Sequence, residues 1–241
     1  MQEPEYLYED DDLIVCYKPA GVATQTKRIG QKDMESLLRN HVALAMRKAG
    51  RSGVPYIGVV HRLDQPVEGV MVFAKTPQAA AKLSAQVKER SIGKHYYALV
   101  QLPEGTGDFT EATGLPEKGT LCDEILFEPK QNMSRIVPKG TKNAKTAKLD
   151  YELVAQKDGK ALLQISLHTG RHHQIRVQLA NLGTPICGDS KYGKNEPGEL
   201  GLCSYRLSFL HPKDGRRMAY EIQPENRKIR ELYGDFYTDQ S

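Results

Sequence analysis

Two runs of alternating apolar and polar residues, 149–156 and 160–168, are separated only by Lys157-Asp158-Gly159. The runs, LDYELVAQ and KALLQISLH, have the period of two that is typical of half-buried strands. Asp-Gly between two such runs is a strong hairpin signal, because both residues tolerate the backbone of a tight turn. The sequence therefore makes antiparallel β-structure a fixed part of the fold.

Further strands and a few helices are predicted on both sides of this hairpin. Strands are expected at 13–19, 57–64, 70–75 and 94–102, and two more within 204–222. Helices are expected at 33–48, from Thr76-Pro77 onward, after Gly170 and at 225–233. Strands outnumber helices and hairpins outnumber crossovers, which predicts an α+β fold with a mixed, largely antiparallel sheet and flanking helices. No long linker or repeat interrupts the chain, so we expect one domain over residues 1–241.

Two of these helices carry more specific predictions. The first is expected to begin at the cap Asp33 and to place on one face Leu37, His41, Leu44 and Ala45. The second, within RHHQIRVQLANLG, is expected to be amphipathic, with Ile175, Leu179 and Leu182 at positions i, i+4 and i+7. Gly170 and Arg171 would lie at its N-terminus, where free N–H groups suit an anion.

Composition excludes several classes of protein. Hydrophobic residues make up 39% of the chain, yet no apolar run approaches the roughly 20 residues that span a bilayer. The first residues, MQEPEYLYEDDD, have neither the basic start nor the apolar stretch of a signal peptide, so we expect a cytoplasmic protein. The four cysteines form no C-x-x-C pair, and the sequence indicates neither a metal site nor a disulfide framework.

Charge is distributed unevenly along the chain. The formal net charge is +4, but residues 1–12 carry six acids and no Lys or Arg. The stretch 129–149 carries six Lys or Arg and no acid. Such a stretch is consistent with a polyanion partner such as nucleic acid, and equally with a solvated loop.

Three short clusters could carry chemistry. HRLDQPVEG, residues 61–69, places Asp64 at the end of the apolar run 57–64, where it is either a catalytic carboxylate or an ordinary turn residue. KHYYALV, residues 94–100, puts Lys94 and Tyr96 on one face of a strand, as a base-stacking surface or as core. HTGRHHQIR, residues 168–176, is basic, but adjacent histidines diverge on a helix and do not favour a metal site.

Taken together, the motifs resemble those of the RluA-type family of RNA pseudouridine synthases. The resemblance rests on HRLD-x4-G-x4-AK, then K-x-Y-x-A-x-V, then TGR-x-HQIRV-x-LA-x-x-G-x-PI-x-GD-x-x-YG, in this order. LYEDDDLIVCYKPAGVAT and LCSYRLSFLHP are similar to the first and last motifs of that family. The likeness extends from about residue 6 to 222. We expect no N-terminal S4-type RNA-binding module of the kind that many relatives carry.

The resemblance implies an enzyme that isomerises uridine in ribosomal or transfer RNA to pseudouridine after base flipping. It implies that Asp64 is the catalytic carboxylate, that Tyr96 stacks on the uracil, and that Arg176 pairs with Asp64. It implies RNA contacts for Arg62, Arg171, His173, Gln174 and Lys191. Because no group is lost and no redox change occurs, no cofactor or metal is expected. The expected partner is RNA alone, bound by a monomer without a membrane or an obligate protein partner.

Some positions depart from the family's usual motifs. Tyr17 stands where the family usually has Asn before Lys-Pro, and Val67-Glu68 stand where Thr-Ser is common. His172, Gln178 and Cys203 replace a common Thr, His and His, respectively. These departures bear on substrate choice more than on reaction type.

Two other functions are compatible with the residues. An inactive RNA-binding protein of the same fold would not require Asp64, Tyr96 and Arg176 together. A nucleoside or glycoside hydrolase would use Asp64 with a second carboxylate such as Glu68, and would release free base or sugar.

Overall fold

A computed structural model of the chain describes residues 4–26, 30–193 and 198–238. The chain forms two compact units. Unit 1 comprises Met1–Gly93 and Ser204–Ile222, and unit 2 comprises Lys94–Cys203 and Gln223–Ser241. The expectation of one continuous domain stays a prediction.

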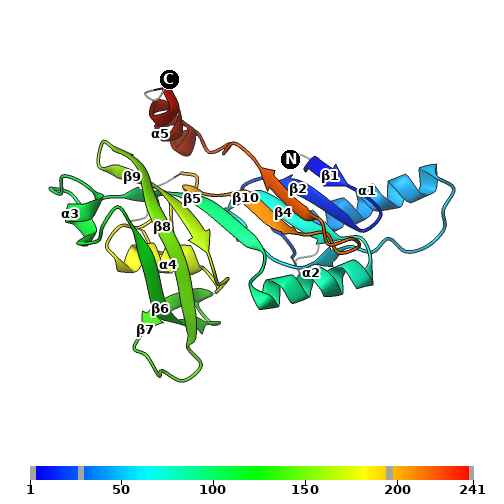
Figure 1. Cartoon of the computed structure of the whole chain (residues 1–241), viewed down its shortest axis with the longest axis horizontal. Coiled ribbons are helices and arrows are strands. Elements are labelled where there is room, and N and C mark those ends of the chain that lie inside the picture. Colours follow the sequence, from blue (N-terminus) through cyan, green and yellow to red (C-terminus); the bar gives the residue numbers. More distant parts are fainter. Residues whose placement is uncertain (1–3, 27–29, 194–197, 239–241) are drawn as a thin grey trace. The chain divides into compact units, whose positions relative to one another are not determined.

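Unit 1 is built on strands that lie in the order β1-β2-β4-β10, with β3 paired to β4 and β11 paired to β10 (Figure 1). Their bounds are β1 Glu5–Glu9, β2 Leu13–Lys18, β3 Gly58–Val59, β4 Glu68–Ala74, β10 Leu202–Leu210 and β11 Arg217–Glu221. All residues of β2 and β4 are buried, and the two strands pair antiparallel, from Leu13 opposite Ala74 to Lys18 opposite Gly69. This pair forms the centre of the unit.

Gly69 shows how tightly this centre is packed. Its φ is +140°, and a Cβ placed there would lie 2.4 Å from the carbonyl oxygen of Ser204 in β10. Only glycine satisfies both the backbone angle and the close approach. The glycine of the HRLD-x4-G motif is therefore a packing requirement.

The helices of unit 1 begin where the sequence predicts. Helix α1 (Met34–Lys48) has the cap Asp33, whose side chain accepts from the Ser36 N–H in a capping box. Helix α2 (Pro77–Glu89) has the cap Thr76 and packs against β4 and β3. The predicted face of α1 is wrong, because its buried residues are Met34, Leu38 and Val42. The sequence carries two apolar stripes, and Leu44 of the other stripe is 57% exposed.

Unit 2 contains antiparallel strands in the order β5-β9-β8-β6-β7 (Figure 1). Their bounds are β5 Gly93–Gln101, β6 Lys118–Glu128, β7 Met133–Val137, β8 Lys145–Lys157 and β9 Lys160–Leu167. The predicted β8–β9 hairpin is confirmed, and Asp158 and Gly159 both have positive φ, 51° and 69°, as a two-residue turn of this hand requires.

Three helices complete unit 2: α3 (Phe109–Thr113), α4 (Gln174–Asn181) and α5 (Arg227–Thr238). Helix α4 packs against β7 and β6, and α5 against β8 and β9. The α+β class with a largely antiparallel sheet is confirmed, and each strand pair with a described register is antiparallel except one isolated bridge. No helix in the described part of the chain is both long enough and apolar enough to cross a membrane.

Candidate active site

Asp64 lies in a loop of unit 1 rather than at the end of a strand. The predicted strand over 57–64 is wrong in length, because β3 covers only Gly58–Val59 and residues 60–67 connect it to β4. Arg62 is exposed, Leu63 is buried and Asp64 is half-buried. The Asp64 carbonyl accepts from the Val67 N–H at 3.0 Å, which closes a turn after it. The loop therefore presents the Asp64 and Arg62 side chains while Leu63 anchors it.

Both neighbours of Asp64 in the chain are fixed by buried groups. The Thr24 hydroxyl donates to the Leu63 carbonyl at 2.9 Å and accepts from the Leu63 N–H at 3.2 Å. The Gln65 carbonyl accepts from the Gly21 N–H at 2.9 Å and from Lys18 Nζ at 3.1 Å. A carboxylate with its backbone held on both sides is preorganised, as a catalytic group must be.

Lys18 and Thr24, which hydrogen-bond the backbone on either side of Asp64, were not singled out from the sequence. Lys18 is 0% exposed, although it ends a strand just before Pro19. Burial lowers the pKa of Lys18 to about 7, against an upward pull from the Asp64 and Glu68 carboxylates. The Lys-Pro motif marks Lys18 in the sequence. It does not predict that the side chain is buried, because lysine is almost never fully buried.

In unit 2, Tyr96 is a buried residue of β5. It is 6% exposed and lies opposite Ile165 of β9. The adjacent Tyr97 is also buried, at 5% exposure, on the other face of the strand. The structure therefore places Tyr96 in a rigid strand, and its stacking on uracil stays a prediction.

Arg176 forms a buried bidentate ion pair with Asp189. Its Nε donates to Oδ2 at 2.8 Å and its Nη2 to Oδ1 at 2.7 Å, with side chains 4% and 0% exposed. Burial raises the pKa of Asp189, but hydrogen bonding and charge from Arg176, with two backbone N–H groups, hold it below its ordinary value. Asp189 lies in the quoted GD-x-x-YG motif, yet the sequence analysis missed it. The predicted pairing of Arg176 with Asp64 stays a prediction.

Helix α4, which carries Arg176, is shorter and more buried than predicted. It starts at Gln174, with His173 as cap at φ 53°, so Gly170 and Arg171 precede its first turn. Residues 174–179 are all buried, which contradicts the predicted amphipathic pattern. The apolar spacing of Ile175 and Leu179 is real, but Arg176 and the two glutamines are buried too. Each of the three makes a side-chain hydrogen bond, while Gln178 Oε1 is buried without a partner.

The residues expected to contact RNA differ in exposure. Arg171 and Lys191 are half-buried, and their terminal groups donate to the carbonyls of Thr146 at 2.9 Å and Asn132 at 2.6 Å. Gln174 is 3% exposed and bonds Thr169 and the Lys148 carbonyl, so in this conformation it braces the loop before α4. His173 is 8% exposed. Their contacts with RNA stay predictions.

A chain of aromatic rings lies beside Arg176. The rings of His172 and His173 are 3.7 Å apart between centroids, and His173 Nδ1 lies 2.9 Å from the Tyr192 hydroxyl. The Arg176 guanidinium lies over the Tyr192 ring, 5.3 Å from its centroid. Histidine at 172, a departure from the family motif, also contacts the Phe127 ring at 4.3 Å.

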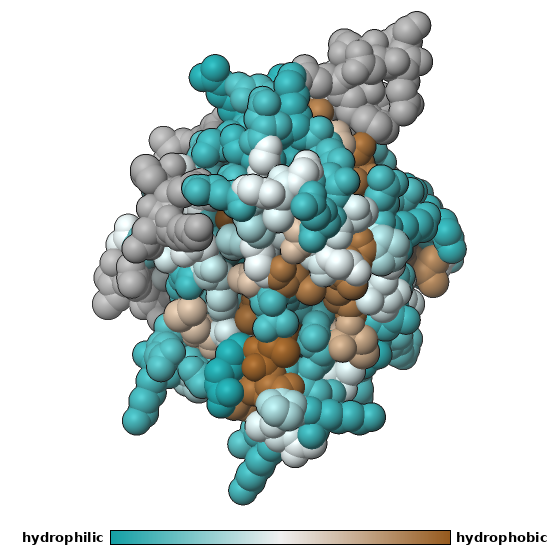
Figure 2. All heavy atoms as spheres, turned by 90° about the vertical axis from the view of Figure 1, so that its left-hand side faces the viewer, coloured by the Kyte–Doolittle hydropathy of each residue, from teal (hydrophilic) through white to brown (hydrophobic). Residues whose placement is uncertain are grey.

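The basic stretch 129–149 is a β-structure and not a loop alone. It contains β7 and the first part of β8, and all six of its Lys and Arg side chains are exposed. Figure 2 shows the face on the left-hand side of Figure 1, where hydrophilic side chains surround a smaller strip of hydrophobic ones. Strands β7 and β8 lie on either side of β6, and a sheet that displays cations is suited to a phosphate backbone.

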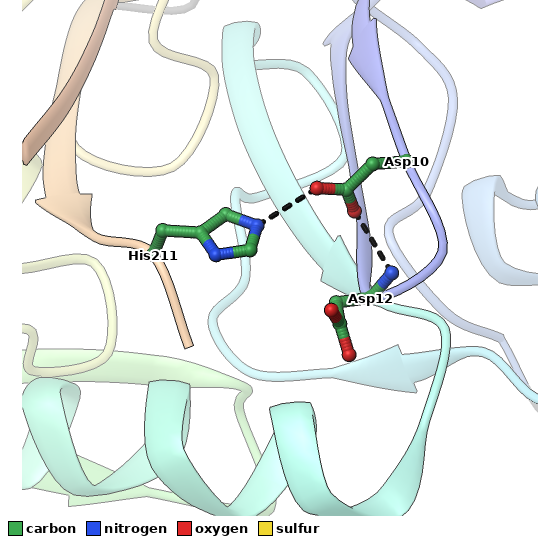
Figure 3. A group of neighbouring side chains, drawn as sticks. All are labelled: Asp10, Asp12 and His211. Carbon is green, nitrogen blue, oxygen red and sulfur yellow. Dashed lines mark hydrogen bonds and ion pairs between the residues drawn. The ribbon is translucent and has the colours of Figure 1, made fainter. Parts of the chain in front are cut away.

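One group of side chains has the composition of a metal site, Asp10, Asp12 and His211 of unit 1 (Figure 3). Asp10 Oδ1 accepts from the backbone N–H groups of Asp12 at 2.8 Å and Leu13 at 2.9 Å. Its Oδ2 accepts from the Tyr8 hydroxyl at 2.9 Å and lies 2.8 Å from His211 Nε2. Because both oxygens are engaged, we assign this group to closing the β1–β2 turn.

The chain belongs to the RNA pseudouridylate synthase family, whose model matches residues 12–181. It is 32% identical to ribosomal large subunit pseudouridine synthase D of Nitrosomonas europaea, covering 89% of this chain and 60% of that protein. It is 34% identical to an uncharacterized RNA pseudouridine synthase of Aquifex aeolicus, covering 92% of this chain and 70% of that protein. The family that the motifs predicted is confirmed, although the chain spans only about two thirds of these relatives.

A solved structure has the same fold. Human RNA pseudouridylate synthase domain containing 4 superposes with a TM-score of 0.74 at 21% sequence identity. The match covers 97% of this chain and 93% of that one. At this identity the likeness supports the fold alone.

Proposed function

We propose that the chain is an RNA pseudouridine synthase that isomerises uridine in ribosomal RNA. The observation that carries this proposal is the family match over residues 12–181, which includes both the HRLD loop and Arg176. In the reaction the C1′–N1 bond breaks and a C1′–C5 bond forms. The proton on C5 is released to water and N1 gains a proton, so atoms and charge balance without a cofactor.

Asp64 is proposed as the catalytic carboxylate, acting as nucleophile or base on a flipped uridine. The hydrogen bonds on Leu63 and Gln65 support this role, because they limit the movement of the Asp64 backbone. Tyr96 is proposed to stack on the uracil, and Arg176 to keep the catalytic carboxylate ionised.

RNA is proposed to bind through Arg62, Arg171, His173, Gln174 and Lys191, together with the exposed lysines of the β7–β8 region. Contacts of this kind with phosphate position an RNA without reading its sequence. The protein is proposed to act as a monomer in the cytoplasm. The name of the Nitrosomonas relative makes large-subunit ribosomal RNA the first substrate to test.

The test is release of tritium from RNA transcribed with uridine labelled at C5. Large-subunit ribosomal RNA and transfer RNA are each incubated with wild type, Asp64→Asn and Asp11→Asn, an exposed control aspartate. Release by wild type and by Asp11→Asn, but not by Asp64→Asn, is expected. RNA binding without release from any RNA would instead indicate an inactive binding protein, and free uracil would indicate a hydrolase.

A further inference from the structure

Phe127 is an exposed aromatic residue near the end of β6. Among the residues of unit 2 whose side chains the structure describes, it is the only large hydrophobic one that is exposed, at 43%. Its ring contacts the ring of His172, with centroids 4.3 Å apart and planes at 51°. His172 stands where the family motif usually has threonine, so this pair of rings departs from that motif. The Phe127–His172 pair leaves part of an aromatic surface open to solvent.

Hydrogen bonds hold the His172 side of the pair in place. Ser134 is buried in β7 directly opposite Phe127, so the two side chains leave the same face of the β6–β7 pair. The Ser134 hydroxyl donates to the His172 carbonyl at 2.9 Å and lies 3.0 Å from His172 Nδ1. The Ser134 N–H donates to the Tyr192 hydroxyl at 2.7 Å. Both the backbone and the ring of His172 are therefore anchored, and a ligand that binds the pair has little side-chain motion to arrest.

Cations lie on the segments that carry the two rings. Lys130 is exposed in the turn that follows β6. Lys191 reaches the same turn, because its Nζ donates to the Asn132 carbonyl at 2.6 Å. Arg171 directly precedes His172 and is half-buried. A ligand on the ring pair would therefore meet positive charge from two sides of the chain.

The acidic residue next to Phe127 does not cancel this charge. A carboxylate oxygen of Glu128 lies 2.7 Å from Arg135 Nε, so the two side chains form an ion pair. This pairing neutralises Glu128, and the three cations favour a polyanion. A nucleic acid is a polyanion that also brings flat apolar faces, since each of its bases can stack on an aromatic ring. Charge and ring together therefore indicate an unpaired base with its phosphate.

We propose that the Phe127–His172 pair is a stacking site for an unpaired base of the RNA. The rings of His173 and Tyr192 separate His172 from Arg176, which is proposed to act at the catalytic carboxylate. The stacked base is therefore a neighbour of the flipped uridine and not the uridine itself. It is bound whatever its identity, because every base has a π-face. The proposal rests on the proposed function only in taking RNA as the partner.

The experiment measures binding to three labelled probes of about 12 nucleotides by fluorescence anisotropy. They are an RNA single strand of mixed sequence, its duplex with the complementary strand, and an abasic strand that has phosphates but no bases. Phe127→Ala should weaken binding to the single strand about 5- to 150-fold, the effect of losing one stacked base. Its affinity for the other two probes should equal that of wild type. Since Phe127 carries no charge, the slope of log affinity against log salt should not change.

Further variants separate stacking from apolar contact. Phe127→Tyr keeps an aromatic ring and should bind the single strand like wild type. Phe127→Leu keeps an apolar side chain without a ring, so it should bind the single strand as weakly as Phe127→Ala. His172→Thr removes the other ring of the pair and should weaken single-strand binding in the same direction. It carries the test if the variants at Phe127 do not fold.

Tyr6→Ala is the matched control, because Tyr6 is also an exposed ring paired with a histidine. Tyr6 is 39% exposed, and its centroid lies 4.3 Å from that of His41. The surroundings of this pair are acidic, since Glu9 lies 2.7 Å from His41 Nε2. Tyr6→Ala should therefore leave the affinity for each of the three probes unchanged.

Three results would overturn the proposal. An equal loss of affinity for all three probes in Phe127→Ala would mean that the ring only supports the β6–β7 pair. Wild-type binding of the single strand by Phe127→Leu would indicate apolar contact without stacking. Unchanged binding of every probe by Phe127→Ala would exclude RNA as the partner of this ring and indicate another, such as a second copy of the chain. Absence of tritium release from wild type would refute the proposed function and leave the binding result standing.

Discussion

Asp189→Asn should destabilise the protein strongly, although it changes only one atom of the side chain. The Asp189 carboxylate accepts two hydrogen bonds from Arg176. Its Oδ1 also accepts from the backbone N–H groups of Lys191 at 2.9 Å and Tyr192 at 3.1 Å. An asparagine has one acceptor oxygen, so its amide NH₂ faces a guanidinium donor in either orientation, and faces the two backbone donors as well if it replaces Oδ1.

The magnitude follows from the burial of the pair. Both side chains are almost fully buried, so loss of one charge leaves the Arg176 guanidinium without compensation. Breaking a buried ion pair in this way costs about 3–5 kcal/mol of the free energy of unfolding. For a chain of this size, that corresponds to a fall in the melting temperature of roughly 6–20 °C.

The assay is urea unfolding at equilibrium, followed by circular dichroism at several pH values. The pKa of Asp189 is lower in the folded state than in the unfolded state, so its ionised carboxylate stabilises the fold. This stabilisation is fully present above the unfolded-state pKa and is lost as the pH falls through the folded-state pKa. The difference between wild type and Asp189→Asn should therefore shrink below about pH 4. If Asp189→Asn lowers the free energy of unfolding by less than about 1 kcal/mol at neutral pH, the buried ion pair does not stabilise the fold as argued.

A paired replacement distinguishes the ion pair from its surroundings. Arg176→Met with Asp189→Leu removes both charges and keeps most of the volume. This double variant should recover a large part of the stability that Asp189→Asn loses, because no buried charge remains unpaired. It should stay inactive in tritium release, since Arg176 has a proposed catalytic role.

Three further predictions concern other parts of the chain. Gly69→Ala should cost about 2–6 kcal/mol in urea unfolding, because its φ of +140° and its approach to Ser204 both exclude a Cβ; a loss within error would contradict this. Thr24→Val should lower the free energy of unfolding by about 2–4 kcal/mol and lower kcat, since the N–H and carbonyl of Leu63 both lose their hydrogen-bonding partner. An unchanged kcat would show that the function of Asp64 does not depend on these two hydrogen bonds. Replacing Lys139 and Lys142 by Ala should weaken binding to all RNAs alike and lower the slope of log affinity against log salt by up to about 2, measured by fluorescence anisotropy; an unchanged slope would exclude phosphate contacts.

Local signals predicted the elements of the fold well. The Asp33 and Thr76 caps mark true helix starts, and the Asp158-Gly159 turn closes the expected hairpin. These features depend on residues within a few positions of one another. The family motifs identified the family for the same reason, because they are contiguous runs.

Burial and long-range partners could not be predicted in the same way. Met34 and Leu38 of α1 are buried while Leu44 is exposed, and only tertiary packing decides between the two apolar stripes. Lys18 is buried because carbonyls from separate loops converge on it, the farthest 47 positions away. Arg176 was assigned a partner from the family pattern, while its observed partner, Asp189, is separated from it by 13 positions.

The division of unit 1 between two stretches of sequence affects how the protein is made. Strand β10 neighbours β4 in the sheet, yet about 110 residues, Lys94–Cys203, are synthesised between the two parts of the unit. At roughly 5–20 residues per second, the ribosome needs about 5–20 seconds to complete this stretch. During that time one edge of β4 waits without β10, while the hairpins of unit 2 have all their strands available. The last part of unit 1 to be translated therefore sets the earliest moment at which the sheet behind Asp64 can be complete.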